Sequence, residues 1–213
     1  MNAQLLQVET AVWRGHAATE AVLAPLVEIN AQCVELLCAM AHRPGVLLPP
    51  LLAGAPQAWR SLTPGACLKL AGVPWLLVDA GFGAGQPLAS PLVVAPLSGA
   101  PFFGAEARDL FRRVLMFSWH LASTRPQLAR IALGIPPLAA QALSRLRLAE
   151  LDAFAERHPG AMRPRWEHSP GLWRLLLAAA QEEDCTGVAE ASLQGIQLLA
   201  ASCLPPVPVR LKL

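Results

Sequence analysis

The sequence has 213 residues, of which 54% are hydrophobic and 15% are charged, and its formal net charge is +2. This much apolar side-chain surface excludes disorder over most of the chain. A net charge this small does not by itself indicate a nucleic-acid partner. The charged fraction is below the roughly 25% that is usual for soluble domains. We therefore expect part of the surface to be hidden in a protein contact, most simply a self-contact.

The compartment is predicted from the cysteines and the apolar runs. Five scattered cysteines are typical of a reducing compartment. Residues 1–10 lack the basic start and apolar core of a secretion signal. We find no uninterrupted apolar run of about 18 residues, the length that spans a bilayer, because prolines interrupt the most hydrophobic stretches, at Pro49, Pro50, Pro91 and Pro96. The sequence predicts a soluble, cytoplasmic protein.

The first half is predicted to hold one long helix, several short helices and one strand. The long helix covers 21–41, because apolar residues recur at three- and four-residue spacing, at Leu26, Ile29, Cys33, Leu36, Leu37 and Met40. Arg43-Pro44-Gly45 ends it, since proline disfavours helix at the residue before it. Short helices are expected at 57–62 and 64–71, and residues 75–78 form the best strand candidate of the chain.

The second half is predicted to be helical after a linker rich in Gly and Pro at 81–104. An amphipathic helix at 106–123 presents Leu110, Val114, Phe117 and Leu121 on one face. Short helices follow at 127–133, 138–146 and 149–156, then a short segment at 162–167 and helices at 172–180 and 189–201. Three prolines exclude helix from the tail at 204–213.

The two halves share one order of elements, which indicates an internal duplication. Each has a long helix ending in Arg-Pro, then short helices, then a short extended segment. The alternative is that helices rich in Ala and Leu resemble one another by composition alone, and the periodicity leaves both open. A duplication divides the chain into repeats at 1–80 and 105–203, the linker at 81–104 and a flexible tail at 204–213.

In the second half, Leu133-Gly134-Ile135 is followed by Ala139, Leu143, Leu146, Leu148, Leu151 and Ala155-Glu156. These residues and their spacing resemble the core of FlhD, a flagellar transcriptional activator subunit. The helix before this core and Arg165-Trp166-Glu167 after it fall where the family has its dimer helix and a strand. Glu28-Ile29-Asn30 through Leu68-Lys69-Leu70-Ala71 looks like a shorter second copy.

The resemblance implies an all-α fold, dimerisation, and DNA-bound partnership with an FlhC-like subunit. We expect two FlhD-like helical repeats packed as an intrachain pseudo-dimer, with short strands, or a homo-oligomer. The two long helices would form the seam, with interface residues Leu36, Leu37, Met40, Phe117 and Trp119. A plain core role is an equal alternative for Phe117 and Trp119. The linker has no counterpart in the family, and Ala, Leu and Pro replace the polar surface of its core.

The segment 126–145 fits a helix–turn–helix with Gly134 at the turn. A helix that reads the major groove needs hydrogen-bonding side chains on its exposed face. Gln141 is the only such donor on the second helix. A helix–turn–helix used for packing is therefore favoured over one that reads bases.

Basic residues that gather in the second half are candidates for contacts with DNA phosphates. Each arginine guanidinium can bind a phosphate through two donors, and the candidates are Arg145, Arg147, Arg163, Arg165 and Arg174. Acidic residues are interleaved with them at Glu150, Asp152, Glu156 and Glu167. The alternative, which we favour, is a solvated surface of ordinary ion pairs.

Catalytic and metal-binding patterns are weak in this sequence. It has no Cys-x-x-Cys pair, no histidine pair at ligand spacing and no Gly-x-Ser-x-Gly motif. We predict a non-enzymatic protein that uses no cofactor and no metal. Two hypotheses follow. One is an FlhD-like transcriptional regulator subunit acting with protein partners and DNA. The other is an adaptor or antagonist that keeps the dimerisation fold without binding DNA.

Overall fold

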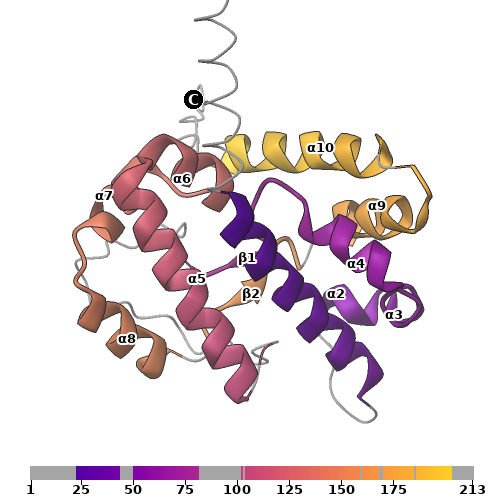
Figure 1. Cartoon of the computed structure of the whole chain (residues 1–213), viewed down its shortest axis with the longest axis horizontal. Helices are drawn as coiled ribbons and strands as arrows, with labels where there is room; N and C mark the ends of the chain where they lie inside the picture. The colour runs from indigo at the N-terminus through magenta and orange to yellow at the C-terminus, as the bar shows by residue number, and fades with distance from the viewer. Residues whose placement is uncertain are drawn as a thin grey trace, which may run out of the picture.

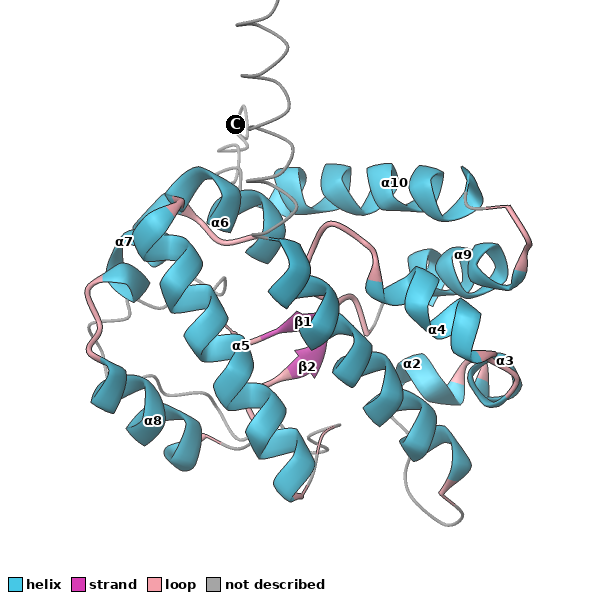
Figure 2. Ribbon diagram, in the orientation of Figure 1, coloured by secondary structure: helices cyan, strands magenta, loops and turns pink. Residues whose placement is uncertain are grey.

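The computed structural model describes residues 23–43, 50–81, 102, 104–158, 160–167, 170–184 and 186–202. The chain is mostly helical in these ranges, with one short antiparallel pair of strands (Figures 1 and 2). The all-α prediction is confirmed at this level. The predicted linker beyond Gly81 and the tail at 204–213 lie almost entirely outside the described residues.

The first half begins with the helix Leu23–His42, as predicted apart from its ends. It continues with α2 (Pro50–Ala53), α3 (Pro56–Arg60), α4 (Pro64–Ala71) and β1 (Val78–Asp79). The bounds predicted for α4 are confirmed, and its N-cap Thr63 accepts a hydrogen bond from the Ala66 N–H at 3.2 Å. The strand prediction is wrong in its bounds, because Trp75, Leu76 and Leu77 precede β1 and pack as core residues.

The second half holds α5 (Ala105–Thr124), α6 (Pro126–Leu133), α7 (Pro137–Ser144), α8 (Leu148–Arg157), β2 (Arg163–Pro164), α9 (Pro170–Gln181) and α10 (Thr186–Ser202). Its helices lie within a few residues of the predicted ranges. Gly134 ends α6 in the left-handed conformation, at φ 61°, and α7 begins at Pro137, so the prediction of a turn at Gly134 between two helices is confirmed.

Prolines explain how a chain with 20 of them is still mostly helical. They stand at the first residue of α2, α3, α4, α6, α7 and α9. Proline is favoured at this position because its fixed φ suits the helix and its missing N–H has no partner there anyway. The helices predicted from the sequence do not include α2, which begins at Pro50.

The two long helices run side by side in opposite directions through the middle of the molecule (Figure 1). The helices α6, α7 and α8 pack beside α5. The helix α9 packs against both α4 and α10. One continuous hydrophobic core contains buried residues of both halves. Its large side chains include Trp59 and Trp173, whose rings lie 5.5 Å apart, and Trp75.

The helix Leu23–His42 is long and apolar enough to meet the length and composition criteria for a membrane span. This corrects the expectation that no apolar stretch is long enough. In the structure, 44% of its apolar window is buried, and residues such as Leu26, Cys33 and Leu37 lie in the core. Core helices of this length meet the same criteria.

A buried junction, consisting of Asn30, residues 71–79 and Arg165, joins the two halves. β1 pairs with β2 in antiparallel register, with Val78 opposite Pro164 and Asp79 opposite Arg163. Backbone hydrogen bonds extend the contact on both sides, from Leu76 N–H to the Ala132 carbonyl and from Arg165 N–H to the Leu77 carbonyl, both at 2.8 Å. The two halves therefore share backbone hydrogen bonds as well as apolar contacts.

Two buried side chains supply most of the polar bonding of the junction. Asn30 accepts from the Leu77 N–H at 2.9 Å and donates to the Trp75 carbonyl at 2.9 Å. Arg165 donates to the carbonyls of Leu76 and Leu133, at 2.9 and 2.8 Å, and to that of Val78 at 3.2 Å. Buried carbonyls require such partners because water cannot reach them.

Two glycines let the C-terminal helix approach the junction closely. A Cβ on Gly195 of α10 would lie 2.4 Å from the Trp75 ring. A Cβ on Gly134 would lie 2.4 Å from Leu199 Cδ2 and 3.1 Å from the Arg165 guanidinium. Only glycine fits at either position without displacing its neighbours.

Candidate functional site

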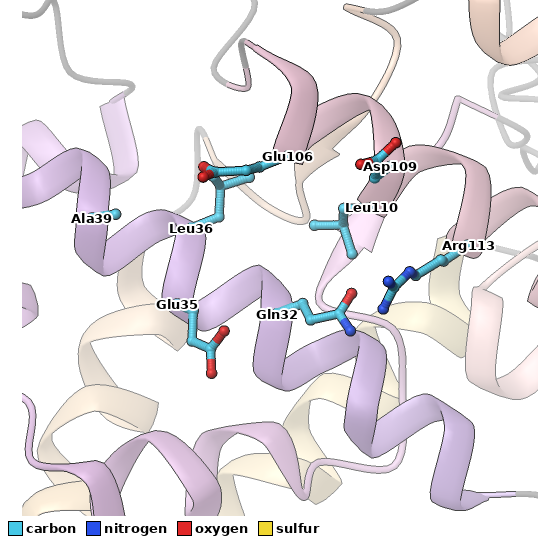
Figure 3. A pocket seen from close by; sticks show the side chains of 8 residues that line it. All are labelled: Gln32, Glu35, Leu36, Ala39, Glu106, Asp109, Leu110 and Arg113. Atoms are coloured by element: carbon cyan, nitrogen blue, oxygen red, sulfur yellow. The ribbon is translucent and has the colours of Figure 1, made fainter.

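A groove between the two long helices combines apolar and charged residues in its lining. Its volume is about 460 Å³, and its lining comes from the helix Leu23–His42 (Gln32, Glu35, Leu36 and Ala39) and from α5 (Glu106, Asp109, Leu110 and Arg113) (Figure 3). This volume lies within the range of known ligand pockets, about 300–1,000 Å³.

The floor of the groove is apolar and its rim is charged. Leu36 and Leu110 are 8% and 3% exposed, so they form a floor continuous with the core. Glu35, Glu106 and Asp109 are exposed along the rim. Figure 3 shows Glu106 extending over Leu36, with Gln32 and Arg113 reaching toward each other further along the groove. An apolar floor with a charged rim is typical of sites that bind amphipathic segments.

Two arginines near the groove, Arg112 and Arg113, are paired with carboxylates, whereas Arg108 on α5 is exposed and has no ion pair among the described residues. Arg113 lies 3.7 Å from Glu28 across the two helices. Arg112 lies 3.0 Å from Glu156 of α8 and 3.9 Å from Asp109. Glu35 and Glu106 have no ion pair among the described residues. The groove is therefore locally negative, although the chain as a whole carries a charge of +2.

The predicted interface residues divide between the seam of the long helices and another contact. Leu36, Leu37, Met40 and Phe117 are all buried, and Phe117 lies two helical turns beyond Leu110, on the same face of α5. Trp119 lies on the opposite face of α5, where its indole N–H donates to the Leu146 carbonyl at 2.8 Å. The assignment of Trp119 to the seam is therefore wrong, and its alternative as a packing residue of the second half is favoured.

The five arginines predicted to contact DNA do not form one surface. Arg165 is 8% exposed and is held by the carbonyls of the junction, so it is not accessible to a phosphate. The Arg163 side chain is 19% exposed and is paired with Glu167 at 2.5 Å. Arg147 is paired with Glu150 at 3.3 Å. Arg145 and Arg174 are exposed.

The Arg147 contact is part of the helix start rather than a phosphate site. The backbone N–H of Arg147 donates to Glu150 at 2.7 Å, as in a capping box, at the N-terminus of α8. This hydrogen bond is the main reason that the pKa of Glu150 is lowered. The charged carboxylate is therefore favoured at the helix terminus.

Cys38 and His158, which are not in the groove lining, have shifted pKa values. Cys38 and Cys67 are in contact, and burial together with this contact raises the pKa of Cys38 to about 12. Desolvation, and then Arg157, lowers the pKa of His158, whose ring packs 4.7 Å from that of Phe154. No group of three or more His, Cys, Asp or Glu residues is arranged to hold a metal ion in the described ranges.

Neither the groove nor the role of Asn30 was predicted from the sequence. Glu35 and Glu106 are 71 residues apart in the sequence (106 − 35), and only the packing of their helices brings them together. The signal for Asn30 was a polar residue within an apolar helix face, which often marks a buried hydrogen-bond partner. Comparisons of the chain with protein-family models, with curated proteins and with solved structures found no match.

Proposed function

We propose that this chain is a non-enzymatic adaptor or antagonist that keeps an FlhD-like dimerisation fold within one chain and acts through protein partners without binding DNA. The observation that carries the proposal is the placement of the arginines. Arg165 donates hydrogen bonds to backbone carbonyls inside the junction, and Arg163 and Arg147 are paired with carboxylates. A phosphate-binding face needs several accessible cations together.

The arrangement of the two halves supports the pseudo-dimer part of the proposal. In each half a long helix precedes short helices and a two-residue strand. The strands pair with each other in antiparallel register, and the long helices run in opposite directions (Figure 1). Equivalent elements meet in this way around a two-fold axis. A tandem repeat would thus present, in one chain, the surface that a dimer builds from two.

A DNA gel shift at increasing salt tests the proposal. We expect no shift of duplex DNA at about 50 mM salt, where contacts with phosphates are strong, for the protein alone or with proteins that it captures. A shift at this salt that weakens in the Arg145→Ala/Arg174→Ala variant contradicts the proposal.

The second candidate is a transcriptional regulator subunit that acts with an FlhC-like partner on DNA. It is favoured by Arg145 and Arg174, which are exposed and have no ion pair among the described residues. A shift that requires both proteins and is lost in the double arginine variant would establish this candidate in place of the first.

A further inference from the structure

We infer that the groove between the helix Leu23–His42 and α5 binds a basic amphipathic helical segment of a protein partner. This inference rests on the proposed function, because it names the partner class and the place where an adaptor of this kind would bind it. The occupant is a helix with apolar residues on one face and Lys or Arg beside them.

The first argument is the shape and chemistry of the floor. Leu36 and Leu110 come from different helices and close the bottom of a hollow of about 460 Å³. Ala39 is exposed at the wall and its short side chain leaves the groove open on that side. Apolar anchors at three- and four-residue spacing on a partner helix can enter such a groove, and burying them is favourable by the hydrophobic effect.

The second argument is charge complementarity. Glu35 projects from the helix Leu23–His42, whereas Glu106 and Asp109 project from α5, with Glu106 extending over Leu36 (Figure 3). A basic segment in the groove would meet carboxylates from both helices. The only cation in the lining, Arg113, is paired with Glu28. An acidic partner would meet uncompensated carboxylates, which disfavours binding by like-charge repulsion.

The third argument is that the negative charge is local. The chain has a net charge of +2, so a basic segment is not attracted to the molecule as a whole. Within a Debye length of about 8 Å in physiological salt, the nearby carboxylates dominate. The same argument disfavours a groove-to-groove contact with a second copy of this chain, because the carboxylates of the two grooves would repel each other.

The test measures binding of a fluorescent peptide of Leu and Lys, roughly 14 residues long, or about four helical turns. A peptide with Glu in place of Lys keeps the apolar pattern and is the first control. We expect the Lys peptide to bind the full chain, with an affinity that falls as salt rises, and the Glu peptide not to bind. Absence of binding by the Lys peptide, or equal binding by the Glu peptide, overturns the inference.

Two variant pairs locate the binding site. Glu35→Lys/Glu106→Lys reverses two rim charges, and Glu183→Lys/Glu190→Lys reverses two exposed charges outside the groove lining. Both pairs change the net charge by the same amount. We expect the groove pair to lower the affinity for the Lys peptide about tenfold. The control pair should change this affinity by less than about twofold. Equal weakening by both pairs overturns the inference.

A third variant tests the groove without changing its charge. Ala39→Trp fills the wall of the groove, and Ala189→Trp places the same ring at an exposed site on α10. We expect only Ala39→Trp to weaken binding, with circular dichroism of both variants unchanged. Peptide binding that Ala39→Trp leaves unaltered contradicts the inference.

The groove and the proposed function fail in distinguishable ways. If a purified protein partner binds equally well to the wild type and to the Glu35→Lys/Glu106→Lys variant, the groove inference is wrong and the adaptor proposal stands. If the chain shifts DNA, the adaptor proposal is wrong whatever the peptide does. Self-association that the groove variants abolish identifies a second copy as the occupant and also overturns the inference.

Discussion

The buried junction and the groove use polar residues in opposite ways. In the junction, Asn30 and Arg165 satisfy backbone groups that water cannot reach. In the groove, Glu35 and Glu106 remain in solvent without an ion pair among the described residues. Polar groups of the first kind hold the two halves in one arrangement, whereas those of the second kind contribute little to folding and remain available for binding. Asn30 and Arg165 therefore stabilise the fold, whereas Glu35 and Glu106 remain available to contact a partner.

The largest expected effect is at Arg165. In Arg165→Met, the buried carbonyls of Leu76, Val78 and Leu133 lose their donors. Each orphaned acceptor costs about 1–3 kcal/mol, and we expect the free energy of unfolding to fall by about 3–5 kcal/mol in a urea titration. Arg145→Met at an exposed site is the control. Equal stability of the two variants would mean that the junction is not a main stabilising contact.

The next effect is at Asn30. Replacement by the similarly sized leucine leaves the Leu77 N–H and the Trp75 carbonyl without partners. We expect a loss of about 2–3 kcal/mol in the free energy of unfolding. Gln32→Leu, two residues further along the same helix and in the lining of the groove, should change the free energy of unfolding by less than about 0.5 kcal/mol. A larger loss of stability in Gln32→Leu than in Asn30→Leu would contradict the distinction between junction and groove.

A smaller loss is expected at Gly195. The added methyl group of Gly195→Ala would lie 2.4 Å from the Trp75 ring, so α10 must move. Overpacking of this kind costs about 1–3 kcal/mol, which thermal unfolding followed by circular dichroism can measure. Gly171→Ala is the matched control, since a Cβ there meets nothing within 4 Å. A Gly195→Ala variant as stable as this control would show that α10 adjusts freely.

Alkaline pH is expected to weaken the packing of the helix Leu23–His42 on α4. The pKa of Cys38 is raised from 9.0 to about 12, first by burial and then by Cys67. A group with a raised pKa in the folded state contributes stability below pH 9 and loses it as the pH rises toward 12. We expect the melting temperature to fall over this window, and to fall less in Cys38→Ala. Identical pH profiles would exclude this thiol as a cause.

The smallest effect is expected in the groove itself. Glu35→Gln/Glu106→Gln removes two exposed charges that have no ion pair among the described residues. The free energy of unfolding should change by less than about 0.5 kcal/mol. The same variant should lower the affinity for the Lys peptide. A large loss of stability would show that the rim carboxylates serve the fold and would remove the contrast with the junction.

Much of the secondary structure could be predicted from the sequence because it depends on local patterns. The apolar spacing in α5 and the Thr63-Pro64 start of α4 identify helices without tertiary information. The strand was misplaced because Trp75-Leu76-Leu77 is apolar for packing, with its backbone bonded to Asn30, Ala132 and Arg165. Partners of this kind lie far away in the sequence and leave no periodic signal.

The candidate site was less predictable than the fold. An arginine-rich stretch reads as a basic surface, yet Arg165 lies inside because three carbonyls from two halves converge on it. Glu35 and Glu106 are ordinary solvated residues in their own helices. Their common groove arises from the side-by-side packing of those helices, which is a tertiary property.

The guanidinium of Arg165 donates to Val78 in the first half and to Leu133 in the second. A polypeptide cut between residues 81 and 104 would therefore give two fragments, neither of which can complete this set of bonds. The fragments would regain the native state only by complementation, when both are present together. The protein therefore cannot be shortened to one of its halves without losing the interior that both halves share.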